Sequence, residues 1–319
     1  MKKISVLIPC YNEEGNVVDI SKAIEDELKN KCSQYDYEIC FIDNYSTDNT
    51  RTLIRELCKH NPKIKAIFNV RNFGPFNSPF YGMTQLNGDC VLMISCDFQD
   101  PIELIPKLIE EWENGAKIVA PVKSKNKENI LMNLFRTLYY KLMRKLSDAE
   151  FIEQFTGFGL YDKDFIDVLR KLKDPTPFLR GIVAELGFKI ATVPYVHGRR
   201  RSGKSKFNLY KLFDAAMLSF TSYTKVGLRV ATIGGGIIAF MSFIVGLFYF
   251  IRKLIYWNEM PIGIAPLVIG VFFLGALQLF FIGFLGEYIM SINTRIMNRP
   301  LVIEEERLNF GDNKEGGDE

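Results

Sequence analysis

Two long stretches without a charged residue, residues 230–251 and 262–285, lie near the end of this 319-residue chain. They are 22 and 24 residues long, and at 1.5 Å per residue each reaches the roughly 30 Å thickness of the hydrocarbon core of a bilayer. An uncharged apolar run of this length favours a membrane span over a buried core helix. We therefore expect residues 229–290 to form a hairpin of two transmembrane helices.

Positive charges predict the orientation of this hairpin. Residues 199–229 carry eight Lys or Arg side chains and one acidic residue, Asp214. Under the positive-inside rule this segment and both chain termini lie in the cytoplasm. Met1-Lys2-Lys3 leads directly into a β-rich run, so no signal peptide is expected. The sequence thus predicts an integral membrane protein with two spans, whose large N-terminal part is cytoplasmic.

Short β-rich runs alternate with amphipathic segments over residues 1–200. The predicted strands cover residues 4–9, 38–43, 65–68, 90–95 and 117–120, and the predicted helices cover residues 14–28, 50–60 and 102–114. This alternation is typical of βαβ crossovers and predicts an α/β domain with a mainly parallel, Rossmann-like sheet. In such sheets ligands bind at the carboxyl ends of the strands.

Polar side chains gather where three of these predicted strands end. The residues concerned are Pro9, Tyr11, Asn12 and Glu13 after the first run, Asp43 at the end of the second, and Asp97, Gln99 and Asp100 after the fourth. Taken singly, Asn12 fits a helix cap and Asp43 fits a turn. Together they indicate a ligand site, in which Asp43 accepts hydrogen bonds from a base or ribose. Asp97 and Gln99 offer hard oxygen ligands for Mg²⁺ or Mn²⁺ facing substrate phosphates.

The cysteines and the C-terminal tail carry weaker predictions. None of the six cysteines forms a C-x-x-C pair, so we expect reduced side chains that act as small apolar residues. The tail, residues 291–319, is polar and acidic, and we expect it to be cytosolic and partly disordered.

Six segments resemble glycosyltransferase family 2, and within it the polyprenyl-phosphate sugar transferases. They are SVLIPCYNEE (5–14), FIDNYSTDNT (41–50), NVRNFG (69–74), CDFQDPIELIP (96–106), TGFGLYDKDF (156–165) and RRSGKSKF (200–207). The resemblance covers residues 4 to about 295 and keeps the family's order. It implies a GT-A fold, a nucleotide-sugar donor, a divalent cation (Mg²⁺ or Mn²⁺) and a lipid-phosphate acceptor.

The resemblance also implies roles for individual residues. The donor-binding residues would be Pro9, Tyr11, Asn12, Glu13, Asp43, Arg71 and Asp97; Asp97 and Gln99 would hold the metal; Asp97, Asp100, Arg200 and Lys206 would be catalytic; and Arg200, Ser205 and Lys206 would bind the phosphates of donor and acceptor. The partners expected are a nucleotide sugar, with UDP favoured, a polyprenyl phosphate and the bilayer, but no nucleic acid. A bacterial inner membrane is favoured, and a homo-oligomer is left open.

Three of these motifs depart from the family's pattern. Ser95 stands where many relatives have the first Asp of an Asp-x-Asp-x-Gln motif, so one metal carboxylate is missing. Asn44 and Tyr45 replace the Asp and Gly of the usual Asp-Asp-Gly-Ser run, which loosens the transfer of base specificity. Gly157 occupies the slot of an Asp that could serve as a general base. A phosphate acceptor is already ionised at pH 7 and needs no base, so this last change favours a lipid phosphate over a sugar hydroxyl.

The basic segment supports two interpretations. It could clamp phosphate oxygens through Arg200, Ser205 and Lys206, or it could only attract anionic lipid headgroups. The aromatic and apolar stripe that follows in residues 207–224 predicts an interfacial amphipathic helix. We therefore divide the chain into a GT-A domain (1–200), a basic loop with this helix (201–228), the hairpin (229–290) and the tail.

Two other functions remain open at this point. A polysaccharide synthase would use a sugar acceptor, but it usually has more spans and a Gln-x-x-Arg-Trp motif, which this chain lacks. A non-catalytic membrane scaffold or nucleotide-sugar sensor would explain the missing carboxylates. The leading hypothesis is inverting transfer of a hexose from a nucleotide sugar to a polyprenyl phosphate.

Overall fold

The computed structural model describes residues 1–124, 152–172, 174–196, 198, 264–297 and 299–311, with scattered positions between 233 and 255. Its strands are β1 (Lys3–Cys10), β2 (Asp36–Asp43), β3 (Ile64–Asn69), β4 (Cys90–Met93), β5 (Ile118–Lys123), β6 (Gly159–Asp162), β7 (Ile190–Tyr195) and β8 (Glu304–Leu308). Its helices are α1 (Val17–Lys31), α2 (Thr50–His60), α3 (Gly74–Thr84), η1 (Ile102–Leu104, a 3-10 turn), α4 (Ile105–Glu113), α6 (Lys163–Lys171), α7 (Leu179–Glu185) and α10 (Ile264–Ile296).

The strands form one sheet in the order β7-β5-β6-β4-β1-β2-β3-β8. Four pairs are parallel: β1 with β2, β1 with β4, β2 with β3, and β5 with β7. Strand β6 runs antiparallel to both β4 and β5, and β8 runs antiparallel to β3. The prediction of a mainly parallel α/β sheet is confirmed, and the loops after β4, β1, β2 and β3 become neighbours at one edge.

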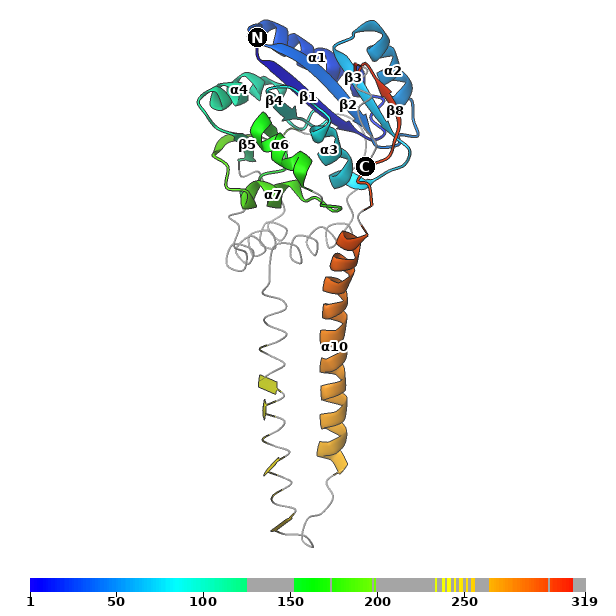
Figure 1. The fold of residues 1–319 in the computed structure, drawn as a ribbon, viewed down its shortest axis with the longest axis vertical. Coiled ribbons are helices and arrows are strands. Elements are labelled where there is room, and N and C mark those ends of the chain that lie inside the picture. Colours follow the sequence, from blue (N-terminus) through cyan, green and yellow to red (C-terminus); the bar gives the residue numbers. More distant parts are fainter. Residues whose placement is uncertain are drawn as a thin grey trace.

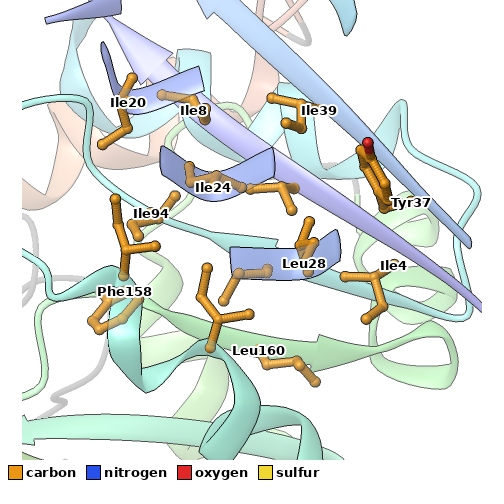
Figure 2. Packing of buried hydrophobic residues seen from close by; sticks show 14 of the residues in the cluster. Ile4, Ile8, Ile20, Ile24, Leu28, Tyr37, Ile39, Ile94, Phe158 and Leu160 are labelled. Atoms are coloured by element: carbon orange, nitrogen blue, oxygen red, sulfur yellow. The ribbon is translucent and has the colours of Figure 1, made fainter. Parts of the chain in front are cut away.

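Alternating side chains of the central strands bury two separate cores. Ile4, Val6 and Ile8 of β1 face the cluster that α1, α2 and α4 cover, whereas Leu7 faces the cluster under α3, α6 and α7. Figure 2 shows α1 on the first face, with Ile20, Ile24 and Leu28 packed over the β1 and β2 side chains. These three residues recur every four positions, which places them on one side of a helix. The sheet is therefore covered on both faces, as βαβ crossovers require.

Helix α10 is the one described helix that is long and apolar enough to cross a membrane. Its window of residues Phe273–Met290 has a mean hydropathy of 1.6, and 7% of that window is buried. Leu279 is 71% exposed, so water would contact an almost wholly apolar surface if no lipid covered it. Figure 1 shows α10 projecting from the sheet domain as a long rod. Residues 264–285 of the second predicted span fall within this helix.

The first predicted span is only sparsely described. The positions that the structure does describe between 233 and 255 are helical and partly or fully exposed, such as Ile237 and Phe240. The two-helix hairpin therefore stays a prediction. The interfacial helix predicted in residues 207–224 lies outside the described residues.

Residues Glu304–Leu308, which lie within the predicted tail, form the ordered strand β8. This strand follows α10 and pairs with β3 at the edge of the sheet, in red in Figure 1. Its charges did not prevent folding because each Glu meets an arginine: Glu305 pairs with Arg51, Glu306 with Arg55, and Glu304 with Arg307. The sheet domain thus includes a segment well beyond residue 200.

Candidate functional site

Three residues with left-handed backbone mark the loops at the carboxyl edge of the sheet. Asn12 follows β1 with φ 56°, Tyr45 follows β2 with φ 69°, and Phe98 follows β4 with φ 59°. Positive φ is uncommon outside glycine and clusters at ligand sites, where the surrounding structure holds the strain. Tyr45 occupies the position of the family's usual Gly, which explains why relatives favour Gly there. The backbone therefore supports the ligand edge that the sequence predicts.

The β1 and β2 loops are joined by direct hydrogen bonds. The Asn12 N–H donates to Ser46 Oγ at 2.8 Å, and the Thr47 N–H donates to Asn12 Oδ1 at 2.8 Å. The Glu13 N–H donates to Thr50 Oγ1 at 2.8 Å. Asn12 therefore connects the loops after β1 and β2, whereas a residue that only caps a helix would bond within its own loop. These bonds hold the predicted residues Pro9 to Glu13 beside the end of β2.

Asp43 lies at the centre of this arrangement and is fully buried. Its carboxylate accepts hydrogen bonds from the N–H (3.0 Å) and the hydroxyl of Ser46, and its Oδ2 lies 3.0 Å from Nε of Arg51. Burial raises the pKa of Asp43, although these donors act in the opposite direction. A carboxyl group is thus buried in the loop after β2 at an energetic cost to its ionised form, which is expected of a binding group and unusual for a purely structural one.

Asn44 has a clear reason to be an amide here. Its Nδ2 donates to Asn72 Oδ1 (3.1 Å) and Gly74 O (3.0 Å), and its Oδ1 accepts from the Phe73 N–H at 2.8 Å. An ionised Asp could not donate the first two bonds. This departure from the family's pattern therefore braces the β2 loop against the loop after β3. That second loop carries the predicted donor residue Arg71, whose guanidinium is exposed and lies 4.1 Å from the ring centroid of Phe73.

The loop after β4 holds the predicted metal ligands. Asp97 is 8% exposed, and its Oδ1 accepts the Gln99 N–H at 3.2 Å. Within the described residues, no three His, Cys, Asp or Glu side chains converge as a metal cluster. One carboxylate with an amide fits a Mg²⁺ or Mn²⁺ that takes its remaining ligands from water and donor phosphates. The residues present therefore fit the cation, with a reduced set of protein ligands.

Asp100 is 3% exposed and tied to two neighbours. The N–H of Ser95 (3.2 Å) and its hydroxyl donate to Oδ2, and the Tyr195 hydroxyl donates to Oδ1 at 3.2 Å. Burial and the nearby carboxylate raise the pKa of Tyr195, so its hydroxyl remains a proton donor. Ser95, in the slot of the missing metal carboxylate, thus orients Asp100.

A cavity of about 220 Å³ opens beside Asp100. It is mostly apolar: its lining includes Pro9, Ser95, Asp100, Gly157 and Arg180, together with the aromatic side chains of Phe76, Phe80, Phe158 and Phe178. Gly157 has φ 102°, and a Cβ there would lie 3.2 Å from Cε of Met93. An Asp could occupy position 157 only with strain. The slot of the family's general base is therefore part of the cavity but carries no carboxylate.

Gly198 places the start of the basic segment against the Asp97–Gln99 loop. Its N–H donates to Gln99 O at 2.9 Å, and a Cβ on it would lie 3.0 Å from Phe98 O. The two backbones therefore approach closely at this glycine. Arg200 follows two residues later, and two residues span at most about 7 Å. Arg200, Ser205 and Lys206 themselves lie outside the described residues, so their roles stay predictions.

Three residues at this edge were missed from the sequence. Arg51 contacts Asp43, Tyr195 bonds Asp100, and Arg180 lines the cavity. Tyr195 and Arg180 come from elements far along the chain from the strand-end motifs at this edge, whereas Arg51 lies in the first turn of α2, soon after Asp43. Arg180 follows Pro175 and Pro177, but this segment matches no pattern that identifies a site.

Comparison with known proteins is consistent with this geometry. Residues 5–169 match the family described as Glycosyl transferase family 2. The chain is 35% identical over 304 residues to the SfII prophage-derived bactoprenol glucosyl transferase of Shigella flexneri, covering 94% of this chain and 97% of that protein. It is 33% identical over 304 residues to the prophage bactoprenol glucosyl transferase homolog of Escherichia coli (strain K12), covering 94% and 98%.

Similar solved structures include glucosyl-3-phosphoglycerate synthase from Mycobacterium tuberculosis in complex with Mn²⁺, UDP-glucose and phosphoglyceric acid. It has a TM-score of 0.46 and 20% identity, and the match covers 69% of this chain and 78% of that one.

Proposed function

Since the chain belongs to glycosyl transferase family 2 and is a glycosyltransferase, we propose that it transfers a hexose from a nucleotide sugar to a membrane polyprenyl phosphate. The observation that carries this proposal is the match along nearly the whole chain to bactoprenol glucosyl transferases. The exposed apolar helix α10, attached to the sheet domain, supports an acceptor that lives in the bilayer.

The donor would lie across the loops after β1, β2 and β4. Asp43 would accept hydrogen bonds from the nucleoside, with UDP favoured, beside Pro9, Tyr11, Asn12 and Glu13. Asp97 and Gln99 would hold Mg²⁺ or Mn²⁺ against the diphosphate, and that cation would neutralise charge on the leaving group. Arg71 would add a positive charge at the rim of the donor loops.

The acceptor phosphate would attack the anomeric carbon from the cavity side. The second pKa of a phosphate monoester is near 6, so the nucleophile is ionised at pH 7 without an enzyme base. This agrees with Gly157 in the slot of the base and with Asp100 held by Ser95 and Tyr195. Asp100 would position the sugar. A single displacement of this kind inverts the anomeric configuration.

In this reaction the anionic acceptor phosphate must approach the anionic diphosphate of the donor. The positive charges of the basic segment would permit this approach. Arg200, Ser205 and Lys206 would clamp phosphate oxygens next to the Asp97–Gln99 loop, because Gly198 docks the start of that segment there. Both the clamp and a general attraction to anionic headgroups use the same charges.

A donor screen tests the proposal. Purified protein in bilayers receives UDP- and GDP-sugars with and without polyprenyl phosphate, and the release of nucleoside diphosphate is measured. The proposal predicts release with one donor that depends on the lipid phosphate. Binding of a nucleotide sugar without any release would instead identify a sensor.

A further inference from the structure

The segment that follows the membrane helix is built into the donor edge of the sheet. Helix α10 ends at Ile296, and β8 begins only at Glu304, yet β8 pairs with β3. Phe68 lies opposite Glu306 and Asn69 opposite Glu304, so a register shift leaves Glu305 between the two pairs. Figure 1 shows β8 closing the sheet beside β3 and α2. Strand β3 leads directly into the loop that carries Arg71. The C-terminal segment therefore lies next to the loop that carries Arg71.

This attachment is specific. Val302 is buried, and Leu301 and Phe310 pack against the second core cluster. The Asn309 side chain donates to the carbonyls of Cys58 and Ile64, each at 2.7 Å. Contacts on both ends of the strand fix its register, so its charged side chains have defined partners.

One of those partners, Arg51, connects β8 to Asp43. Nη2 of Arg51 donates to Glu305 Oε2 at 2.8 Å and to the carbonyl of Asn69 at 3.0 Å, while Nε lies 3.0 Å from Asp43 Oδ2. The guanidinium also lies 5.2 Å from the ring centroid of Phe68. A planar guanidinium group that is held at several points has little freedom to rotate. Nε lies within ion-pair distance of Asp43 without a hydrogen bond to it, so its position beside that carboxylate depends on what holds Nη2.

We propose that Glu305 is a positioning residue of the donor site, which acts through Arg51 on the Asp43 carboxylate. This rests on the proposed function only in taking Asp43 as a nucleoside ligand. Through the contacts from Glu305 to Arg51 and Asp43, strand β8, which follows α10, becomes part of the nucleotide site. The Glu305 side chain is 46% exposed, so its ion pair contributes little to global stability, and its loss should be felt in donor binding.

The neighbouring residue supplies a matched control. Glu306 pairs with Arg55 at 2.7 Å on the same strand, and its side chain is 35% exposed. Arg55 lies over Phe68 as Arg51 does, but neither Glu306 nor Phe68 belongs to a donor loop. Glu306→Gln therefore removes an equivalent charge pair from the same edge without touching the path to Asp43.

The experiment measures the dissociation constants of UDP and GDP, the donor KM and kcat, and thermal stability for Glu305→Gln, Glu306→Gln and Arg51→Lys. We expect Glu305→Gln to raise the nucleotide Kd and donor KM by roughly three- to tenfold, with kcat within about twofold of the wild type. Glu306→Gln should leave both constants unchanged. Arg51→Lys should raise the Kd at least as much, and adding Glu305→Gln to it should have no further effect, because both act along one path.

Equal changes in Glu305→Gln and Glu306→Gln, or additive effects of Glu305→Gln and Arg51→Lys, would show that β8 acts only as an edge strand and would overturn the proposal. Wild-type protein that binds neither nucleotide would overturn it as well. If nucleotide binding shifts as expected but no lipid product forms, the coupling stands and the proposed acceptor is wrong.

Discussion

Adding one methyl group at Gly198 should disturb the junction between the basic segment and the metal loop. A Cβ there would lie 3.0 Å from Phe98 O and 3.3 Å from Gln99 O, where carbon–oxygen contacts are usually about 3.3–3.6 Å. The Phe98 carbonyl must therefore recede by about 0.3–0.6 Å. The hydrogen bond from the Gly198 N–H to Gln99 O, now 2.9 Å, would lengthen toward the limit of about 3.2–3.5 Å at which such bonds weaken.

The expected cost to stability of Gly198→Ala is about 1 kcal/mol, the contribution of one hydrogen bond. The expected loss of kcat in Gly198→Ala is proportionally larger than the loss of stability. A misplacement of about 1 Å can lower a rate about a hundredfold, so a shift of half that size should lower kcat by about tenfold. Asp97 and Gln99 belong to the loop that moves, and the donor would feel the shift directly.

Gly187→Ala is the matched control. Gly187 has φ 68°, and a Cβ added to it would have no atom within 4 Å, so Ala there costs about 1 kcal/mol through backbone strain alone. Both variants should lose a similar amount of stability in thermal melts, but only Gly198→Ala should lose turnover with nucleotide sugar and polyprenyl phosphate. Equal turnover in the two variants would refute the view that docking of Gly198 supports catalysis.

Three further predictions concern charged groups of the site. Asp97→Asn, or removal of divalent cations with EDTA, should lower turnover by about two orders of magnitude, the scale of losing one electrostatic stabiliser; full activity in either case would contradict the metal assignment. Arg200→Ala should lower turnover by roughly tenfold or more, whereas Lys225→Ala should cost less than about twofold; equal small losses, recovered by anionic lipid, would leave the basic segment as a membrane patch. Asp43→Asn should weaken nucleotide binding and lower the thermal midpoint, because the amide sets a donor against the two Ser46 donors and leaves Arg51 without its counterion. Burial raises the folded-state pKa of Asp43, so part of the wild-type stability is present at acid pH and lost as pH rises through that pKa. The deficit of the variant should therefore be larger below about pH 4 than at pH 7, and melts that show a smaller deficit at acid pH would contradict this.

The sequence predicted those parts of the fold that rest on local periodicity. The apolar spacing of Ile20, Ile24 and Leu28 identified α1, and the β-rich runs identified β1 to β5. Helix α3 was missed because Pro75 and Pro79 lie within it, and proline is usually a sign of a helix boundary. Its first proline occupies the opening turn, where no N–H is needed.

Strand β8 could not be predicted because its stability comes from distant charges. In the sequence, Glu305 and Glu306 have the pattern of a solvated acidic run. In the folded protein, α2 places Arg51 and Arg55 beside them. The same limit applies to the site. The motif residues after each strand were predicted, but contacts such as Tyr195 with Asp100 depend on topology, which the pattern of one sequence does not specify.

The identity of the acceptor tests the proposed mechanism most directly. Membrane-reconstituted protein would receive the labelled donor with polyprenyl phosphate, with free polyprenol or with a soluble sugar, and thin-layer chromatography would separate the products. The mechanism predicts a polyprenyl monophosphate sugar of inverted anomeric configuration, formed only from the phosphate, with a rate that falls below about pH 6 as the acceptor becomes protonated. Transfer to polyprenol or to the soluble sugar at a comparable rate would contradict it.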